Sequence, residues 1–326
     1  MRASHSTVTA ARKSTAAVSL GALVAAGVLW GTGGPLGSLL SQATGLSMLA
    51  VATYRLLVGG AAIIVMLAAA RRGLPRGLAV WRRVTVIGLL SALYQSSYFT
   101  AIALTSVSMA TLVTIGATPV LVLSAEVLTG RQRVTSRVLV TVVLAVIGLG
   151  LLTSVQPGRL SMIHVLAGTG TALVSAGGFA AVTLLGARPV GGLGELTMTG
   201  GGFALGGALL VPFAAAIGGL GFSLAPAALG LIIALGIAPT AAAYLLYFRA
   251  LRGVSAGTAA LLSIIEPLTT TVLAVLFLGN HLNGANIIGA ALLTATVLLA
   301  STAKQDRPRC PGPANSASGG DTPAPG

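Results

Sequence analysis

Ten apolar segments, most of them about 20 residues long, follow one another through nearly the whole chain. A helix of about 20 residues crosses the hydrocarbon core of a bilayer and satisfies its own backbone hydrogen bonds. Charged residues make up only 7% of the 326 residues, whereas soluble proteins contain about 25%. The sequence therefore predicts an all-α integral membrane protein with ten transmembrane helices, over residues 17–39, 46–70, 84–104, 106–128, 134–154, 163–185, 195–217, 226–248, 255–278 and 284–302.

The positive charges, which give a net charge of +14, lie almost entirely on one side of the predicted membrane. All Lys and Arg residues except Arg55 and Arg159 fall in the termini or in the loops after every second span. Basic loops stay in the cytoplasm, so we expect both termini there. The expected partner of these charges is the lipid bilayer of the cell membrane and not a nucleic acid. Arg2, Arg12 and Lys13 would also suit a signal peptide, but the apolar segment after them is long and leads into further spans.

The two halves of the chain resemble each other. Residues 98–108 read YFTAIALTSVS and residues 247–255 read YFRALRGVS, and residues 117–130 and 265–279 form a second matching pair. Each half contains five spans, and an odd number inverts the second copy relative to the first. Inverted repeats are typical of secondary transporters, which rock about a central site. The expected organisation is a cytoplasmic tail, two five-helix repeats and a disordered cytoplasmic tail, over residues 1–16, 17–154, 163–302 and 303–326.

Together these features resemble the EamA-domain transporters of the drug/metabolite transporter superfamily, over about residues 17–302. The motifs that carry the resemblance are LWG at 29–31, YRLLVGG at 54–60, YFTAIAL at 98–104, YLLYFRAL at 244–251 and the Glu266-Pro267 pair. The resemblance implies a ten-helix, exporter-like fold with a central cavity for small metabolites or drugs. Family members often carry Gly-Glu at the ends of the fourth and ninth helices. This chain has Gly130-Arg131 and Gly279-Asn280 there, so no role of that glutamate is carried over.

Two charged side chains are predicted deep within the membrane. Glu266 lies roughly 16 Å into its span, directly before Pro267, and Arg55 lies at a similar depth in another span. Ionisable residues inside a membrane usually mark transport pathways, so both are candidate cavity residues and Glu266 is a candidate proton carrier. The alternatives are a protonated, structural Glu266 beside a helix kink, and an Arg55 that extends to the membrane surface. Glu126, nearer the cytoplasmic end of its span, is expected to reach the interface or the basic cluster around Arg131.

Aromatic residues are scarce, at 4% of the chain, and several of them are further cavity candidates. With the polar neighbour Gln95, these candidates are Trp30, Tyr94, Tyr98, Tyr244 and Tyr247. Tyr94 and Tyr98 are four residues apart and therefore share one face of a helix. An aromatic ring with a polar tip suits the wall of a binding cavity, but tight packing between helices would use the same residues.

These patterns predict a secondary transporter, and not an enzyme, that exports small organic solutes, with Glu266 as a candidate for proton coupling. The sequence contains no nucleotide-binding motif, so the energy would come from a gradient or from the substrate itself. We expect no metal or other cofactor, because His5, His164 and His281 show no ligand spacing and Cys310 is the only cysteine. The alternatives are a structural or signalling subunit with a vestigial transporter fold and, less favoured because its glutamates are scattered, a lipid-modifying membrane enzyme. A homodimer stays open.

Overall fold

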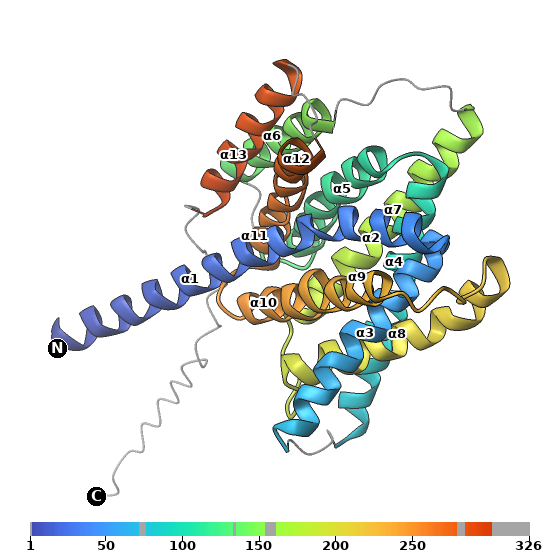
Figure 1. Cartoon of the computed structure of the whole chain (residues 1–326). Helices are drawn as coiled ribbons and strands as arrows, with labels where there is room; N and C mark the ends of the chain where they lie inside the picture. Colours follow the sequence, from blue (N-terminus) through green and yellow to red (C-terminus); the bar gives the residue numbers. More distant parts are fainter. Residues whose placement is uncertain (1, 72–75, 133–134, 154–160, 279–283, 302–326) are drawn as a thin grey trace, which may run out of the picture.

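The computed structural model describes residues 2–71, 76–132, 135–153, 161–278 and 284–301, and every regular element in this part of the chain is a helix (Figure 1). The elements of the first half are α1 (Arg2–Gly31), α2 (Gly33–Thr44), α3 (Met48–Ala69), α4 (Leu78–Leu104), α5 (Val107–Leu128) and α6 (Ser136–Thr153). Those of the second half are α7 (Met162–Gly186), α8 (Glu195–Ile217), α9 (Pro226–Gly236), η1 (Ile237–Ala242), α10 (Ala243–Ala250), α11 (Ala256–Leu262), α12 (Ile265–Leu278) and α13 (Gly284–Ser301).

Each of the ten predicted spans has a helical counterpart. Within the described residues, eight segments are long and apolar enough to cross a membrane. Two shorter apolar helices, Ser136–Leu152 and Gly284–Ala300, lie where the fifth and tenth spans are predicted. Three spans consist of more than one helix, namely α1 with α2, α9 with η1 and α10, and α11 with α12. The predicted tail over residues 303–326 lies outside the described residues.

The N-terminal helix begins earlier than the sequence pattern predicts. A tail is expected over residues 1–16, whereas α1 already begins at Arg2. Residues 2–20 contain neither glycine nor proline, and alanine, the strongest helix former, recurs among them. The hydrophobic pattern therefore marks where the apolar part of the helix begins, but it does not mark where the helix itself begins.

Pro267 divides the ninth span into two helices. Proline has no backbone N–H, so the carbonyl four residues earlier, that of Ser263, loses its helical partner. The chain accordingly leaves the helix at Ser263 and Ile264, between α11 and α12. The Ser263 carbonyl instead accepts the backbone N–H of Glu266 at 3.0 Å. This tighter turn fixes the start of α12 and with it the direction of the Glu266 side chain.

Pro239 has a different effect on the eighth span. It lies in η1, a short π-helix that joins α9 to α10 without ending the span. Wider turns of this kind occur mostly as single bulges within α-helices and often lie at functional sites. Within the turn, the hydroxyl of Thr240 donates to the carbonyl of Leu235 at 2.8 Å. The hydroxyl oxygen of Thr240 is thereby held in place as an acceptor for another helix.

The helices of the two halves contact each other in matching pairs. In the bundle α3 packs against α8 and α6 packs against α13, so each of these helices meets its own counterpart. The contact of α4 with α7 is matched by that of α1 with α10, and the contact of α5 with α7 by that of α1 with α12. Figure 1 shows α6 and α13 together at one corner, away from α3 and α8. Exchanging the halves thus leaves the contact pattern unchanged, as two related repeats require.

Glycines allow several of these helices to approach closely. A methyl group added at Gly27 of α1 would lie 2.7 Å from the side chain of Ile265 in α12. One added at Gly202 of α8 would lie 2.7 Å from the side chain of Ile87 in α4. Both distances are too short for carbon atoms, so only glycine fits. Small residues at a contact between membrane helices let the two backbones approach more closely than leucine would allow.

Candidate functional site

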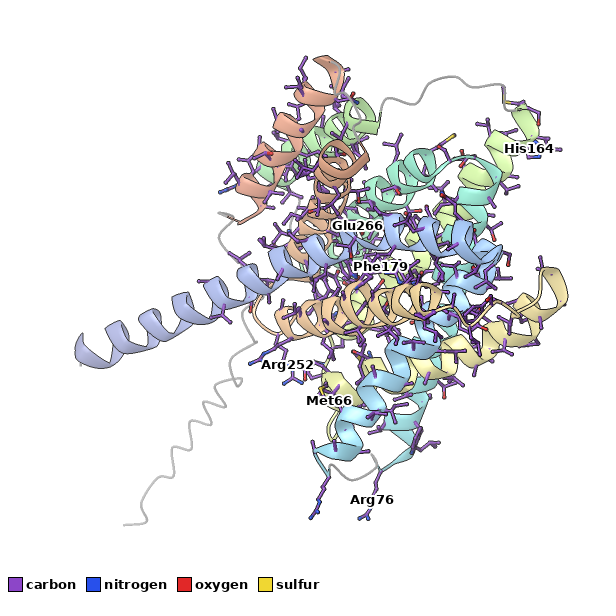
Figure 2. All side chains as sticks on the ribbon, viewed as in Figure 1. Met66, Arg76, His164, Phe179, Arg252 and Glu266 are labelled. Carbon is purple, nitrogen blue, oxygen red and sulfur yellow. The ribbon has the colours of Figure 1, made fainter. Side chains whose placement is uncertain are left out.

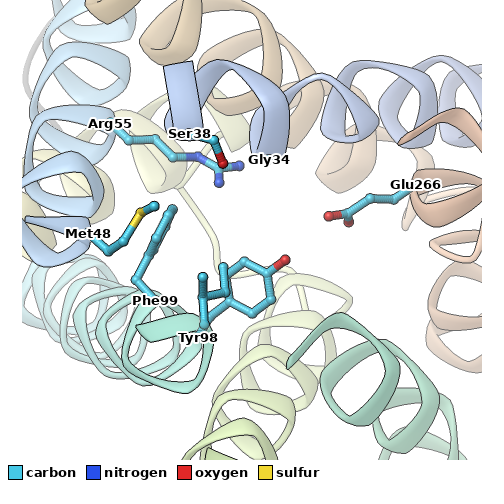
Figure 3. Close-up of a pocket in the computed structure, with 8 residues that line it drawn as sticks. Gly34, Ser38, Met48, Arg55, Tyr98, Phe99 and Glu266 are labelled. Atoms are coloured by element: carbon cyan, nitrogen blue, oxygen red, sulfur yellow. The ribbon is translucent and has the colours of Figure 1, made fainter. Parts of the chain in front are cut away.

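A pocket inside the bundle is lined by side chains from both halves of the chain (Figure 3). Three of its residues are among the candidates predicted from the sequence, namely Arg55, Tyr98 and Glu266. Glu266 comes from α12 of the second half and the other lining residues come from α2, α3 and α4; these are Gly34, Ser38, Met48, Phe99 and Ile102. The structure therefore brings the two intramembrane charges, 211 positions apart in the sequence, to the walls of one pocket.

Arg55 is held in the interior by the π-helical turn of the other half. Its Nε donates to the Thr240 hydroxyl oxygen at 2.8 Å, and its Nη2 donates to the Pro239 carbonyl at 3.1 Å. The residue is only 7% exposed. These bonds exclude an Arg55 side chain that extends along its helix to the membrane surface. Among the described residues no hydrogen bond engages Nη1.

Glu266 reaches into the same pocket from the opposite wall. Figure 3 shows its carboxylate pointing across the pocket toward the side that carries Arg55. Among the described residues no hydrogen bond reaches the carboxylate oxygens, and no ion pair within 4 Å joins Glu266 to Arg55. The turn before Pro267 therefore presents an unpaired carboxylate to the pocket. In the part of the chain that the structure describes, no neighbouring helix offers this carboxylate a hydrogen bond, whereas the helix break that the structural alternative also expects is present before α12.

The remaining wall of the pocket is mostly apolar. Tyr98 is oriented by a hydrogen bond of 2.7 Å between its hydroxyl and that of Thr111 in α5. The ring of Phe99 packs edge-on against that of Tyr98, with 5.5 Å between the ring centroids. Met48 and Ile102 complete this wall. The pocket thus places one cationic group, one anionic group and an apolar surface around a cavity of about 10 Å³, which is the size of a water molecule and would have to widen to take an organic solute.

The other aromatic candidates are packed together in a cluster that does not line this pocket. Trp30, Tyr94, Tyr244 and Tyr247 are each at most 5% exposed, and Phe179 packs among them. Figure 2 shows Phe179 and Glu266 toward the middle of the bundle, with Arg76 and Arg252 at its periphery. In this structure the rings fill space between helices, as the packing alternative predicts. Contact of these four residues with a substrate stays a prediction.

The polar atoms of the aromatic cluster are bonded to one another with one exception. The Tyr94 hydroxyl donates to that of Tyr244 at 2.5 Å, and Gln95 Nε2 donates to the Tyr94 hydroxyl at 3.0 Å. The hydroxyls of Tyr247 and Thr183 lie 2.9 Å apart. Trp30 Nε1 is buried without a hydrogen-bond partner among the described residues. An unsatisfied buried donor is costly, so this arrangement of the cluster carries an energetic penalty at Trp30.

Three residues of the pocket wall have repeat counterparts in or beside the aromatic cluster. Tyr98, Phe99 and Ile102 in α4 correspond to Tyr247, Phe248 and Leu251, each 149 residues later. The first set lines the pocket, although Phe99 is itself only 3% exposed, and the second set is at most 4% exposed and packed in the core. A sequence signal for Phe99 and Ile102 existed in this repeat, since the Tyr-Phe pair occurs in both halves. No comparable signal marks Thr240 as the anchor of Arg55, because the two residues are 185 positions apart.

Glu126 does not reach the interface, in contrast to the expectation from the sequence. It is 8% exposed, and its Oε2 accepts the backbone N–H of Gly257 at 3.1 Å. Gly257 lies in the first turn of α11, so the carboxylate of the first half satisfies a helix N-terminus of the second half. The physical reason for the difference is that a backbone N–H at the start of α11, which has no partner within its own helix, lies within hydrogen-bonding distance of the carboxylate.

The comparisons with known proteins agree with this architecture. A profile of the EamA-like transporter family matches residues 18–154 and, a second time, residues 166–302. The chain belongs to the EamA-like transporter family. It is a multi-pass membrane protein with the two-repeat architecture of that family, and family members are transporters of the drug/metabolite superfamily.

Two relatives of this EamA-like transporter are themselves described only as transporters. The chain is 30% identical over 286 residues to "Uncharacterized transporter YwfM" of Bacillus subtilis (strain 168), which covers 87% of this chain and 94% of that protein. It is 31% identical over 224 residues to an "Uncharacterized transporter" of Archaeoglobus fulgidus, which covers 69% of this chain and 74% of that protein. A solved structure titled "Crystal structure of protein" shares the fold, with a TM-score of 0.73, 20% identity, and coverage of 89% of this chain and 98% of that one.

Proposed function

We propose that the chain is a secondary transporter that exports small organic solutes across the cell membrane by alternating access. The observation that carries this proposal is the pocket in which Arg55 of one half faces Glu266 of the other without pairing. A charge at the middle of a bilayer costs about 2.5–3.5 kcal/mol even on lenient scales, so unpaired charges are retained there for a purpose. A subunit with only a structural role would not need to keep two charged side chains unpaired in its interior.

The direction of the spans follows from the basic loops. With both termini in the cytoplasm, α4 ends at the outer face and α10 ends at the cytoplasmic face. The pocket, whose wall includes the last turn of α4, then belongs to the outer half of the molecule. The aromatic cluster includes Tyr247, in the last turn of α10, and would then close the cytoplasmic half.

Reporter fusions at Gly45 and Gly219 are expected to read outside, and fusions at Arg76 and Gly192 are expected to read inside. A cytoplasmic reading at Gly219 would overturn the inverted arrangement of the repeats.

Alternating access follows from the relation of the two halves. The pocket wall of α4 and the packed cluster of α10 contain corresponding residues, one set lining the pocket and the other packed in the core. A rocking motion that exchanges the conformations of the two repeats would close the outer pocket and open the cytoplasmic cluster. Trp30, whose N–H has no partner in the packed state, would then face the opened side.

Proton coupling is proposed at Glu266, because this carboxylate lies in the pocket without a hydrogen-bond partner among the described residues. The test is Glu266→Gln in proteoliposomes with an imposed proton gradient, which removes the ionisable proton and keeps the shape. We expect the variant to lose gradient-driven accumulation while retaining exchange of internal for external solute. If accumulation persists, Glu266 does not couple protons.

The transport proposal has its own test, which is a screen of the parent protein with labelled amino acids, nucleosides and cationic drugs. If the parent moves none of these solutes, the transport proposal fails and the structural-subunit alternative is favoured.

A further inference from the structure

Three arginines come together where the first two turns of α4 meet the last turn of α7. Arg83 of α4 is half-buried, and its Nη1 donates to the carbonyl of Leu185 in α7. Arg82 and Arg188 are exposed, and both lie close enough to Arg83 to repel its charge. Since α4 belongs to the first repeat and α7 to the second, this arginine cluster of Arg82, Arg83 and Arg188 joins the two halves of the chain.

No carboxylate in the described part of the chain neutralises the arginine cluster. The sequence has only five acidic residues. Three of them are bonded or placed in other parts of the fold, namely Glu126, Glu195 and Glu266. The other two, Asp306 and Asp321, lie outside the described residues. Like charges that are held together repel each other, so the cluster is suited to an anion that is not part of this fold.

An exposed apolar stripe on α4 begins at the arginine cluster. Val86, Leu89 and Leu93 follow Arg82 at steps of three or four residues, and each is at least 37% exposed. Residues at these steps share one face of a helix, so Arg82 lies at the head of this face. From Arg82 to Leu93 the helix rises roughly 16 Å, about the depth of hydrocarbon in one leaflet. The ring of Trp81, 47% exposed, lies next to Arg82, as expected at a membrane interface.

We propose that the arginine cluster binds the phosphate headgroup of an anionic phospholipid whose acyl chains lie on the exposed stripe of α4. A guanidinium presents parallel N–H groups that match two phosphate oxygens, and basic sites between membrane helices suit such headgroups. In the orientation proposed above, this end of α4 faces the cytoplasmic leaflet, which carries the anionic lipids. A free phosphate would neutralise the arginines but leave the apolar stripe unused, whereas a phospholipid uses both.

The two tryptophans of the chain allow a direct measurement. Trp81 lies at the proposed site and is 47% exposed, whereas Trp30 is 4% exposed. Bromine atoms on an acyl chain quench the fluorescence of a tryptophan that they contact. The full-length protein is placed in phosphatidylcholine vesicles with rising fractions of dibrominated phosphatidylglycerol or, in parallel, dibrominated phosphatidylcholine. We expect the anionic lipid to reach half-maximal quenching at a fraction about five- to tenfold lower.

Variants of exposed residues assign this preference to the cluster. Arg82→Gln and Arg188→Gln should each reduce the preference to about half or less, and the double variant should abolish it. Arg131→Gln is the matched control, because Arg131 is exposed at the end of α5 and its charge acts on Glu126. It removes the same charge from another basic loop and should leave the preference unchanged. Trp81→Phe should remove the preferential quenching, since Trp30 is buried.

Three outcomes would overturn the lipid site. The first is equal quenching of the parent by the two brominated lipids. The second is a loss of preference in Arg131→Gln as large as that in Arg82→Gln, because net charge and not the cluster would then attract the lipid. The third is relief of the quenching by inorganic phosphate as effectively as by unlabelled phosphatidylglycerol, since the cluster would then take a free anion. Transport of solute is measured separately, so none of these outcomes decides the proposed function.

Discussion

Two corresponding ends of the molecule differ although their residues are alike. At one end Tyr98 and Phe99 line the pocket, and at the other Tyr247 and Phe248 are packed in the core. The same glycine accompanies each phenylalanine, since Gly37 and Gly186 are also 149 positions apart. A methyl group added at Gly37 would lie 3.9 Å from the Phe99 ring, whereas one added at Gly186 would lie 2.6 Å from the Phe248 ring. The residues at the two ends are therefore repeated, but the distance between the helices that carry them differs.

Under the proposed alternating access, open and closed would be positions of the helices and not properties of the residues at each end. In that proposal, the packed pair of Tyr247 and Phe248 displays the packing that Tyr98 and Phe99 would adopt after the repeats exchange conformations. On the same proposal glycine would be needed at both positions, although in the present structure a methyl group makes ordinary contacts at Gly37 and overlaps Phe248 only at Gly186. Substitutions at the matched positions therefore test the comparison from its two sides.

The largest effect is expected from Gly186→Ala. Its methyl group would overlap the Phe248 ring, and overpacking of this kind costs about 1–3 kcal/mol. If the helices can relieve the overlap by separating, the closed end should open, a shift in population of roughly 5- to 150-fold. The measurement is thiol labelling of Leu251→Cys in a Cys310→Ser background, with and without the alanine.

Gly230→Ala on α9 is the control for that experiment, because a methyl group there would meet no atom within 4 Å. The control should label like the parent and transport like it. Unchanged labelling in Gly186→Ala would show that this glycine contact does not hold the closed end together.

Gly37→Ala is expected to have a smaller effect in the opposite direction, because it should hinder closing of the pocket end and not promote opening of the packed end. In the present state its methyl group would make ordinary contacts, at 3.5 Å from Val51 and 3.9 Å from Phe99. Alanine is also favoured over glycine inside a helix by about 0.5–1 kcal/mol, so thermal stability should be equal or higher. Transport should nevertheless slow, because the pocket end could no longer close to the spacing seen at Gly186. Turnover equal to that of the parent would mean that the two ends do not exchange conformations.

The comparison also explains what could be predicted from the sequence. Span length and apolar character are local, so the ten helical segments could be placed from composition alone, and the Tyr-Phe pairs revealed the repeat. The depth of Arg55 and Glu266 could likewise be counted along their helices, and the structure places both in one pocket.

Other features depend on contacts that no local pattern encodes. The bond of Arg55 to Thr240 spans 185 positions, and that of Glu126 to Gly257 spans 131. Whether Tyr247 lines a cavity or packs in a core depends on which end is closed in the state observed. Since both ends carry the Tyr-Phe pair, that pair alone does not indicate which end is packed.

The smallest effect is expected from removing one tyrosine hydroxyl, and its hydrogen bond, at each end. Tyr247→Phe removes a hydroxyl that bonds Thr183, where both residues are 0% exposed, whereas Tyr98→Phe removes one that bonds Thr111 beside the pocket. A buried bond of this kind contributes about 0.5–1.5 kcal/mol, and water cannot replace it in a packed core. At the pocket, water can take the place of the lost hydroxyl, so Tyr98→Phe should be close to neutral. Thermal unfolding of both variants, each combined with the matching Thr→Val substitution in a double-mutant cycle, measures the two couplings. Equal coupling at the two ends would show that water reaches both alike, and the distinction between an open and a closed end would lose its physical basis.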